Sequence, residues 1–169
     1  MKLLRAKKFI IYNLTFIILF SGCYSFKSGR IPENIKTVNI QYFPNRAAIV
    51  QPSLSQYFTD KMKDKFVSES RLTLVQKEAD LTFEGYISDY NNSPSAIQSN
   101  EQAALNRLTI TISLKFTNAI DPKQDFETTF SRFAEYSSSQ NFTSVETGLI
   151  QDITKQLIDD IYNKSVSNW

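Results

Sequence analysis

The side chains that carry most protein catalysis are scarce in this chain. Its 169 residues contain no histidine and a single cysteine, Cys23. Ser-His-Asp and Cys-His catalysis, and the common zinc sites, therefore lack a necessary part. The acidic pair Asp159-Asp160 lies in a helical pattern, where a solvated helix face is far commoner than a catalytic site. The four glycines are scattered singly and form no phosphate-binding loop. We expect no enzymatic activity, no cofactor and no metal site.

Cys23 has a different use, which the residues before it indicate. The chain opens with the basic stretch MKLLRAKK and continues with the apolar run FIIYNLTFIILF, which is the order of a secretory signal. The run is short for a membrane span, which needs about 20 apolar residues. The small residues Ser21 and Gly22 precede Cys23, and this looks like a bacterial lipobox, in which the cysteine receives a diacylglycerol and the chain is cut before it. Cys23 is therefore predicted to be the lipid anchor, the alternative being an incidental cysteine after a plain signal.

Charge and length bound the rest of the protein. Four of the 19 basic residues lie in the first 22 positions, which leaves 15 against 17 acidic ones and a formal charge of −2. No basic stripe remains, so nucleic acid is not an expected partner. Removal of residues 1–22 from 169 leaves 147, enough for one domain with its own core. We expect a removed signal peptide at 1–22, a lipidated tether at 23–34 and a single domain at 35–169.

Hydrophobic periodicity predicts the elements of the first half. Alternation over residues 36–43 indicates a half-buried strand. Apolar residues then recur at three and four positions from Pro52 to Ser68, which indicates an amphipathic helix. Residues 71–75 and 79–90 return to period two, joined by a polar turn of hairpin length. Gly85 interrupts the apolar face of the second segment, which indicates a bulge or a close backbone contact.

The second half has the clearest alternation. Residues 91–102 are predicted to form a long polar loop, either functional or flexible. Residues 108–117 alternate strictly and predict a strand, and residues 125–138 are its antiparallel mate after an Asp121-Pro122 turn. Phe133 breaks the parity of that mate, which indicates a bulge or a sheet end covered on both faces. Residues 143–146 fit a capping box that opens a second amphipathic helix to about Lys164.

These elements predict an α+β fold. Each strand has one apolar face and each helix one apolar stripe, so the economical packing is a two-layer sandwich. It has an antiparallel or mixed sheet of four to five strands with both helices on one face. The other face of the sheet stays polar and open, which is typical of a binding module.

A family resemblance rests on the order of several motifs. The stretches IPENIKTVNIQYFPNRA, LSQYFTDKMKDKF, LTLVQKEADLTFEGYISDY, AALNRLTITISLKFTN and QLIDDIYNKSVSNW, after the opening CYSF, together resemble the LptE family of lipopolysaccharide-assembly lipoproteins. The resemblance spans nearly the whole mature chain. It implies an outer-membrane lipoprotein on the periplasmic face that plugs the lumen of the β-barrel LptD, assists its assembly and can contact lipopolysaccharide.

The resemblance also implies basic groups that meet lipid A phosphates. Arg107, at the start of the long strand, and Lys115, on its polar face, are the best candidates, although ordinary surface charges are the commoner role of such residues. The aromatic residues at matching periods are expected to be core. Trp169 is expected either to dock on the body or to anchor an interface. The alternative function is an envelope scaffold or regulator of a cell-wall or secretion machine.

Overall fold

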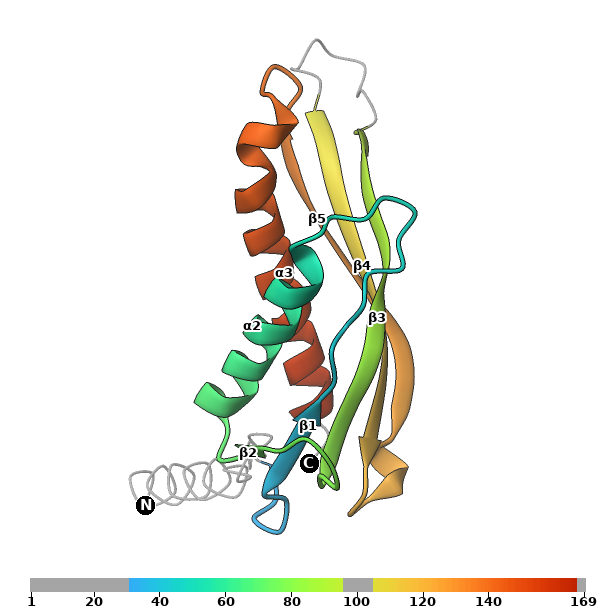
Figure 1. Cartoon of the computed structure of the whole chain (residues 1–169), viewed down its shortest axis with the longest axis vertical. Helices are drawn as coiled ribbons and strands as arrows, with labels where there is room; N and C mark the ends of the chain where they lie inside the picture. Colours follow the sequence, from blue (N-terminus) through green and yellow to red (C-terminus); the bar gives the residue numbers. More distant parts are fainter. Residues whose placement is uncertain (1–30, 96–104, 167–169) are drawn as a thin grey trace, which may run out of the picture.

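The computed structural model describes residues 31–95 and 105–166 as one five-stranded mixed sheet with two helices on one of its faces (Figure 1). Cys23, Trp169 and most of the predicted loop at 91–102 lie outside these residues. The predicted two-layer α+β architecture is confirmed. The elements in chain order are β1 Thr37–Ile40, α2 Leu54–Glu69, β2 Thr73–Leu74, β3 Leu81–Pro94, β4 Leu105–Asn118, the 3-10 turn η1 Pro122–Gln124, β5 Phe126–Ser137 and α3 Phe142–Val166.

The strand order is β2-β1-β3-β4-β5, with β1 parallel to both of its neighbours. The predicted hairpin of β2 with β3 is therefore wrong, because β1 lies between them. Val38 and Ile40 of β1 are buried, and a short apolar strand is covered best in the interior of a sheet. Asp80 fixes this arrangement, because its carboxylate accepts hydrogen bonds from the Lys36 and Thr37 amides at 2.7 and 2.9 Å.

The strands β3, β4 and β5 form a long antiparallel meander. The β3–β4 ladder continues to Pro94 paired with Asn106, so the first residues of the predicted loop belong to a strand. The one register shift in this ladder lies between Ile87 and Asp89. The β4–β5 ladder has no shift, so the predicted bulge at Phe133 is wrong. Phe133 instead lies on the face away from the helices and is 48% exposed.

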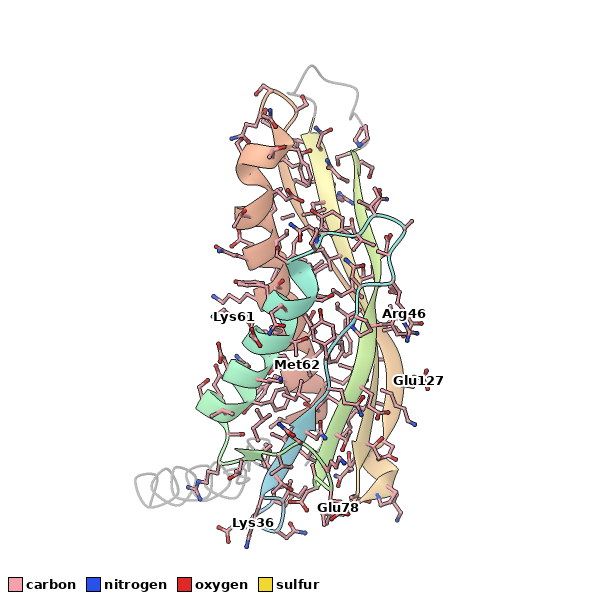
Figure 2. All side chains as sticks on the ribbon, viewed as in Figure 1. Lys36, Arg46, Lys61, Met62, Glu78 and Glu127 are labelled. Atoms are coloured by element: carbon pink, nitrogen blue, oxygen red, sulfur yellow. The ribbon has the colours of Figure 1, made fainter. Side chains whose placement is uncertain are left out.

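Aromatic rings form the centre of the core between sheet and helices. Phe66 of α2 lies 4.6 Å from Phe83 of β3, measured between ring centroids, and Phe83 lies 4.9 Å from Phe116 of β4. All three side chains are almost fully buried, as predicted. Figure 2 shows Met62 of α2 directed toward the sheet and Lys61 directed away from it. Each ring pair at this spacing stabilises the fold by roughly 0.5–1.5 kcal/mol beyond the free energy of burying the rings.

At Gly85, β3 lies in close contact with β4 and with Phe43 of an adjoining loop. A Cβ atom at this position would lie 2.6 Å from Cε1 of Phe43 and even closer to the backbone oxygen of Ser113. The predicted close backbone contact is therefore confirmed. The absence of a side chain lets the buried Phe43 ring pack directly on the sheet.

The α3 helix begins differently from the prediction. Asn141 caps it, because its side-chain oxygen accepts from the Thr143 amide at 3.0 Å. Glu146, the last residue of the predicted capping box, instead accepts a hydrogen bond of 2.5 Å from the Tyr90 hydroxyl of β3. Burial, and secondly this hydrogen bond, raise the pKa of Tyr90. Within residues 31–95 and 105–166, neither helix is long and apolar enough to cross a bilayer.

Candidate functional site

The candidate site is the sheet surface opposite the helices, here called the open face. Alternate residues of β3, β4 and β5 point to it, and the ladder registers align them in rows across the three strands. From one end of the sheet to the other, the rows are Glu84–Lys115–Glu127, Tyr86–Ser113–Thr129, Asp89–Thr111–Ser131, Asn91–Thr109–Phe133 and Ser93–Arg107–Glu135. Figure 2 shows Glu127 on this side of the sheet, away from the helices.

The chemistry of the open face is polar, with few apolar groups. Hydroxyl and amide side chains occupy its middle rows, where the Thr111 and Ser131 hydroxyls hydrogen-bond at 3.0 Å. A cation lies over one of its aromatic rings, since the Arg46 guanidinium is 4.6 Å from the ring centroid of Tyr86. Such a face is suited to water and hydrogen-bonding partners and unsuited to the interior of a bilayer.

Arg107 is already engaged by its neighbours on β5. Its guanidinium donates two hydrogen bonds, of 2.7 and 3.2 Å, to Oε1 of Glu135. It also lies 3.9 Å from the ring centroid of Phe133. The hydrogen bonds from Arg107 and then from Ser95 lower the pKa of Glu135. A phosphate that binds Arg107 must therefore share it with this carboxylate or displace the carboxylate.

Lys115 has a different environment. It is exposed on β4, between Glu84 of β3 and Glu127 of β5 in the same row. Opposite charges on adjacent strands attract each other weakly when exposed. Lys115 is therefore more available to an anion than Arg107, but it sits in a locally acidic row.

The structure places both predicted lipopolysaccharide ligands on the open face of one strand but does not bring them together. Arg107 and Lys115 are eight positions apart on β4, which corresponds to about 26 Å along the strand. The strands of the open face carry these two cations against four carboxylates, Glu84, Asp89, Glu127 and Glu135. One lipid A phosphate cannot contact both cations.

The sequence patterns did not predict Glu135 and Phe133 as partners of Arg107. Counting outward from a two-residue turn at Asp121-Pro122 places Arg107 opposite Tyr136, one residue from its actual mate, so the sequence alone did not give this register. Phe116 pairs with Phe126 next to this turn, and Arg107 then pairs with Glu135.

The acidic pair on α3 is structural. Asp159 accepts from Lys65 of α2 at 2.6 Å, and Asp160 accepts from the Arg132 Nε of β5 at 2.6 Å. The hydrogen bond to Asp160 raises the pKa of Arg132. Both carboxylates are half-exposed, as expected of a helix face, and their ion pairs also join α3 to α2 and β5. Among the described residues, no group of three or more acidic side chains could hold a metal ion.

A cleft of about 860 Å³ lies where β1 begins and α3 ends. Its lining mixes basic Lys36 and Arg71 with acidic Glu33 and Glu69. The opposite charges leave it without a clear preference for an anion or a cation.

The comparison with protein families decides the identity. Residues 35–165 match the family model described as LptE, lipopolysaccharide-assembly. The chain belongs to the LptE family. The family resemblance of the sequence is thereby confirmed, and it makes this protein one of a family of non-enzymatic lipoproteins of the outer membrane that act in lipopolysaccharide assembly.

Solved structures of other proteins share the fold of this LptE-family protein. A minor lipoprotein from Acinetobacter baumannii is 12% identical with a TM-score of 0.56, and the similarity covers 80% of this chain and 95% of that one. A hypothetical protein from Chlamydia trachomatis is 10% identical with a TM-score of 0.53, covering 79% and 99%. At this identity they show the shared fold alone. No curated protein sequence matches the chain significantly.

Proposed function

We propose that this LptE-family protein is the lipid-anchored plug and assembly partner of an LptD-like β-barrel in lipopolysaccharide transport. The observation that carries the proposal is the family match over residues 35–165, which spans both helices and all five strands. The protein supplies no chemistry in this role. It occupies the barrel, keeps it correctly assembled and borders the path of lipopolysaccharide to the outer leaflet.

The open face supports this proposal. The lumen of a large outer-membrane barrel is polar and wet, so a protein inside it must present polar groups on more than one side. The open face does so through five rows of hydroxyl, amide and charged side chains. The solvent side of α2 does so through charged residues such as Lys61 and Asp64, which pair at 3.4 Å.

Attachment through Cys23 keeps the domain close to the membrane. Ile31 already packs against the core, so the seven residues 24–30 between the predicted anchor and the described domain span at most roughly 25 Å when extended. This reach suits a partner embedded in the same membrane and disfavours one deep in the periplasm. Lipid A contact through Lys115 or Arg107 is the part of the proposal that concerns lipopolysaccharide itself.

The test is affinity purification of the full-length lipidated protein from detergent-solubilised envelopes, with mass spectrometry of the proteins that survive a salt wash. We expect a single large β-barrel in near-equal amount. Cys23→Ala serves as the anchor control, because it removes the lipid and leaves the described domain unchanged. We expect loss of its palmitate labelling and less barrel in the membrane fraction.

Two results would contradict the proposal. One is recovery of a cell-wall or secretion enzyme in place of a barrel, which would favour an envelope scaffold. The other is a barrel that folds and functions normally after depletion of this protein.

A further inference from the structure

Within residues 31–95 and 105–166, β5 forms one edge of the sheet, and half of its backbone groups have no partner strand. It pairs with β4 on one side, and no described strand lies on its other side. In an antiparallel strand the amide and carbonyl of alternate residues point to the same side. About half of the 12 residues of β5 therefore direct their hydrogen-bonding groups outward.

This edge lacks several of the features that protect an edge strand. Proteins protect such edges with proline, a bulge, a short strand, a covering helix or loop, or charged side chains, including inward-pointing ones. The β5 sequence FETTFSRFAEYS contains no proline, and its ladder with β4 has no register shift. The strand does carry charges, with Arg132 on the helix side, but they are engaged within the chain, since Arg132 pairs with Asp160 and Glu135 pairs with Arg107. The third charge, Glu127, lies beside Lys115 in the ladder.

The side chains along β5 are incompletely covered in the same region. Phe126 and Phe130 on the helix side are only partly buried, although they pack against the core. Phe133 on the open face is 48% exposed. A strand added beside β5 would cover these rings if it carried apolar side chains toward α3 and mainly polar ones toward the open face.

A second copy of this chain fits the edge poorly. Symmetric antiparallel pairing of two β5 strands that keeps nearly their full length is centred on Ser131 or on Arg132. Centring on Ser131 places Glu127 opposite Glu135 of the other copy, twice. Centring on Arg132 places this arginine opposite its own copy. Even with their partners inside each chain, like charges directly opposite each other add a repulsion that an uncharged strand avoids.

We propose that the outer edge of β5 receives an extended, uncharged segment of a partner protein as a sixth strand of the sheet. Main-chain hydrogen bonds would supply the affinity, and the partly covered phenylalanines would set the register. The inference rests on the proposed function in taking the β-barrel as the protein that carries this segment.

Hydrogen exchange of β5 tests the inference. The purified complex with the barrel is compared with the isolated full-length protein in the same detergent, and peptides covering Phe126–Ser137 are followed by mass spectrometry. We expect about half of the β5 amides, the outward-pointing ones, to exchange at least tenfold more slowly in the complex. Exchange of all β5 amides at the same rate in both samples would overturn the inference.

A pair of lysine substitutions separates the edge from the face. Thr129→Lys places a charge on the edge strand, and Ser113→Lys places the same charge directly opposite it on central β4. Both residues point to the open face, and circular dichroism establishes that each variant folds. We expect Thr129→Lys to reduce the recovered barrel about tenfold and Ser113→Lys to reduce it much less.

The outcomes distinguish this inference from the proposed function. Normal barrel recovery with Thr129→Lys would overturn the edge contact and leave the plug intact. Concentration-dependent protection of β5 in the isolated protein would overturn it in favour of self-pairing. Absence of any barrel with the unsubstituted protein would overturn the proposed function and, with it, the partner named here.

Discussion

Arg107 and Glu135 form a cross-strand ion pair on the open face, with 2.7 Å between Nη2 and Oε1. The pair joins a candidate lipopolysaccharide ligand to a carboxylate that competes with any phosphate. Because its pKa is lowered by the hydrogen bonds from Arg107 and then Ser95, Glu135 stays ionised below the range of an ordinary glutamate. Mild acidification therefore does not release the arginine.

Removal of the competing carboxylate is expected to strengthen lipopolysaccharide binding, if Arg107 is a ligand. We expect Glu135→Gln to raise the affinity of the detergent-solubilised protein for immobilised lipopolysaccharide about three- to tenfold, and Arg107→Ala to lower it. Asp64→Asn, which removes one negative charge from the far side of α2, is the matched control. Equal affinity of Glu135→Gln, Arg107→Ala and the unsubstituted protein would exclude Arg107 as a ligand.

Two glycine-to-alanine changes are expected to have opposite effects on the free energy of unfolding. At Gly85 an added Cβ meets Phe43 and the Ser113 backbone, so Gly85→Ala should destabilise the protein by about 2–3 kcal/mol. At Gly148 of α3 an added Cβ meets nothing within 4 Å, so Gly148→Ala should stabilise it by about 0.5–1 kcal/mol. Urea denaturation of both variants measures the difference. A Gly85→Ala variant as stable as the parent would contradict the close contact.

Asp80 is expected to give the protein a pH-dependent part of its stability. Its pKa is lowered, first by the backbone hydrogen bond from Lys36 and also by those from Thr37. The stabilisation is therefore complete above the unfolded pKa of about 4 and is lost as the pH falls through the lower folded value. We expect Asp80→Asn to lower the free energy of unfolding by about 2 kcal/mol at pH 7.

The difference between Asp80→Asn and the parent should shrink as the solution is acidified below this range. Asp64→Asn again serves as the control, because Asp64 pairs only at the exposed surface with Lys61. A constant difference at every pH would mean that the Asp80 carboxylate acts through its shape and not through its charge.

The Tyr90–Glu146 hydrogen bond is expected to hold α3 against β3. Tyr90→Phe removes the donor and should cost about 1–2 kcal/mol at neutral pH. Because the pKa of Tyr90 is raised, the stability it contributes is complete below the unfolded value of about 10 and is lost as the pH rises through the folded value. Urea denaturation at a series of alkaline pH values measures the difference, which should shrink as the pH rises through the folded value. A difference that stays constant at every pH would contradict a role for the Tyr90 proton in this hydrogen bond.

Local pattern was enough for most elements of the fold. The strict alternation of residues 108–117 and the three- and four-residue spacing of both helices follow from backbone geometry, which repeats every two residues in a strand and every 3.6 in a helix. The structure confirms these elements, the single apolar side of each and the polar open face. Gly85 was recognisable for the same reason, as a gap in an otherwise continuous apolar face.

The order of the strands in the sheet and the partners of individual side chains could not be predicted from local pattern. The position of β1 between β2 and β3 depends on Asp80 and on parallel pairings between segments 43 residues apart, for which no local pattern exists. Asn141 caps α3 in place of the predicted capping box, and Glu146 accepts a hydrogen bond from Tyr90, which lies 56 positions away in the sequence.

The sequence by itself therefore determined most of the elements, the side that each one buries and the family resemblance, since all of these are carried by residues near one another in the chain. The lipid anchor at Cys23 stays a prediction of the same kind. The tertiary structure alone decided that Arg107 is paired with Glu135, that Asp159 and Asp160 tie α3 to α2 and β5, and that β5 lies at an open edge. These are properties of how distant segments meet, and burial of the shared aromatic core, together with strand pairing, sets them.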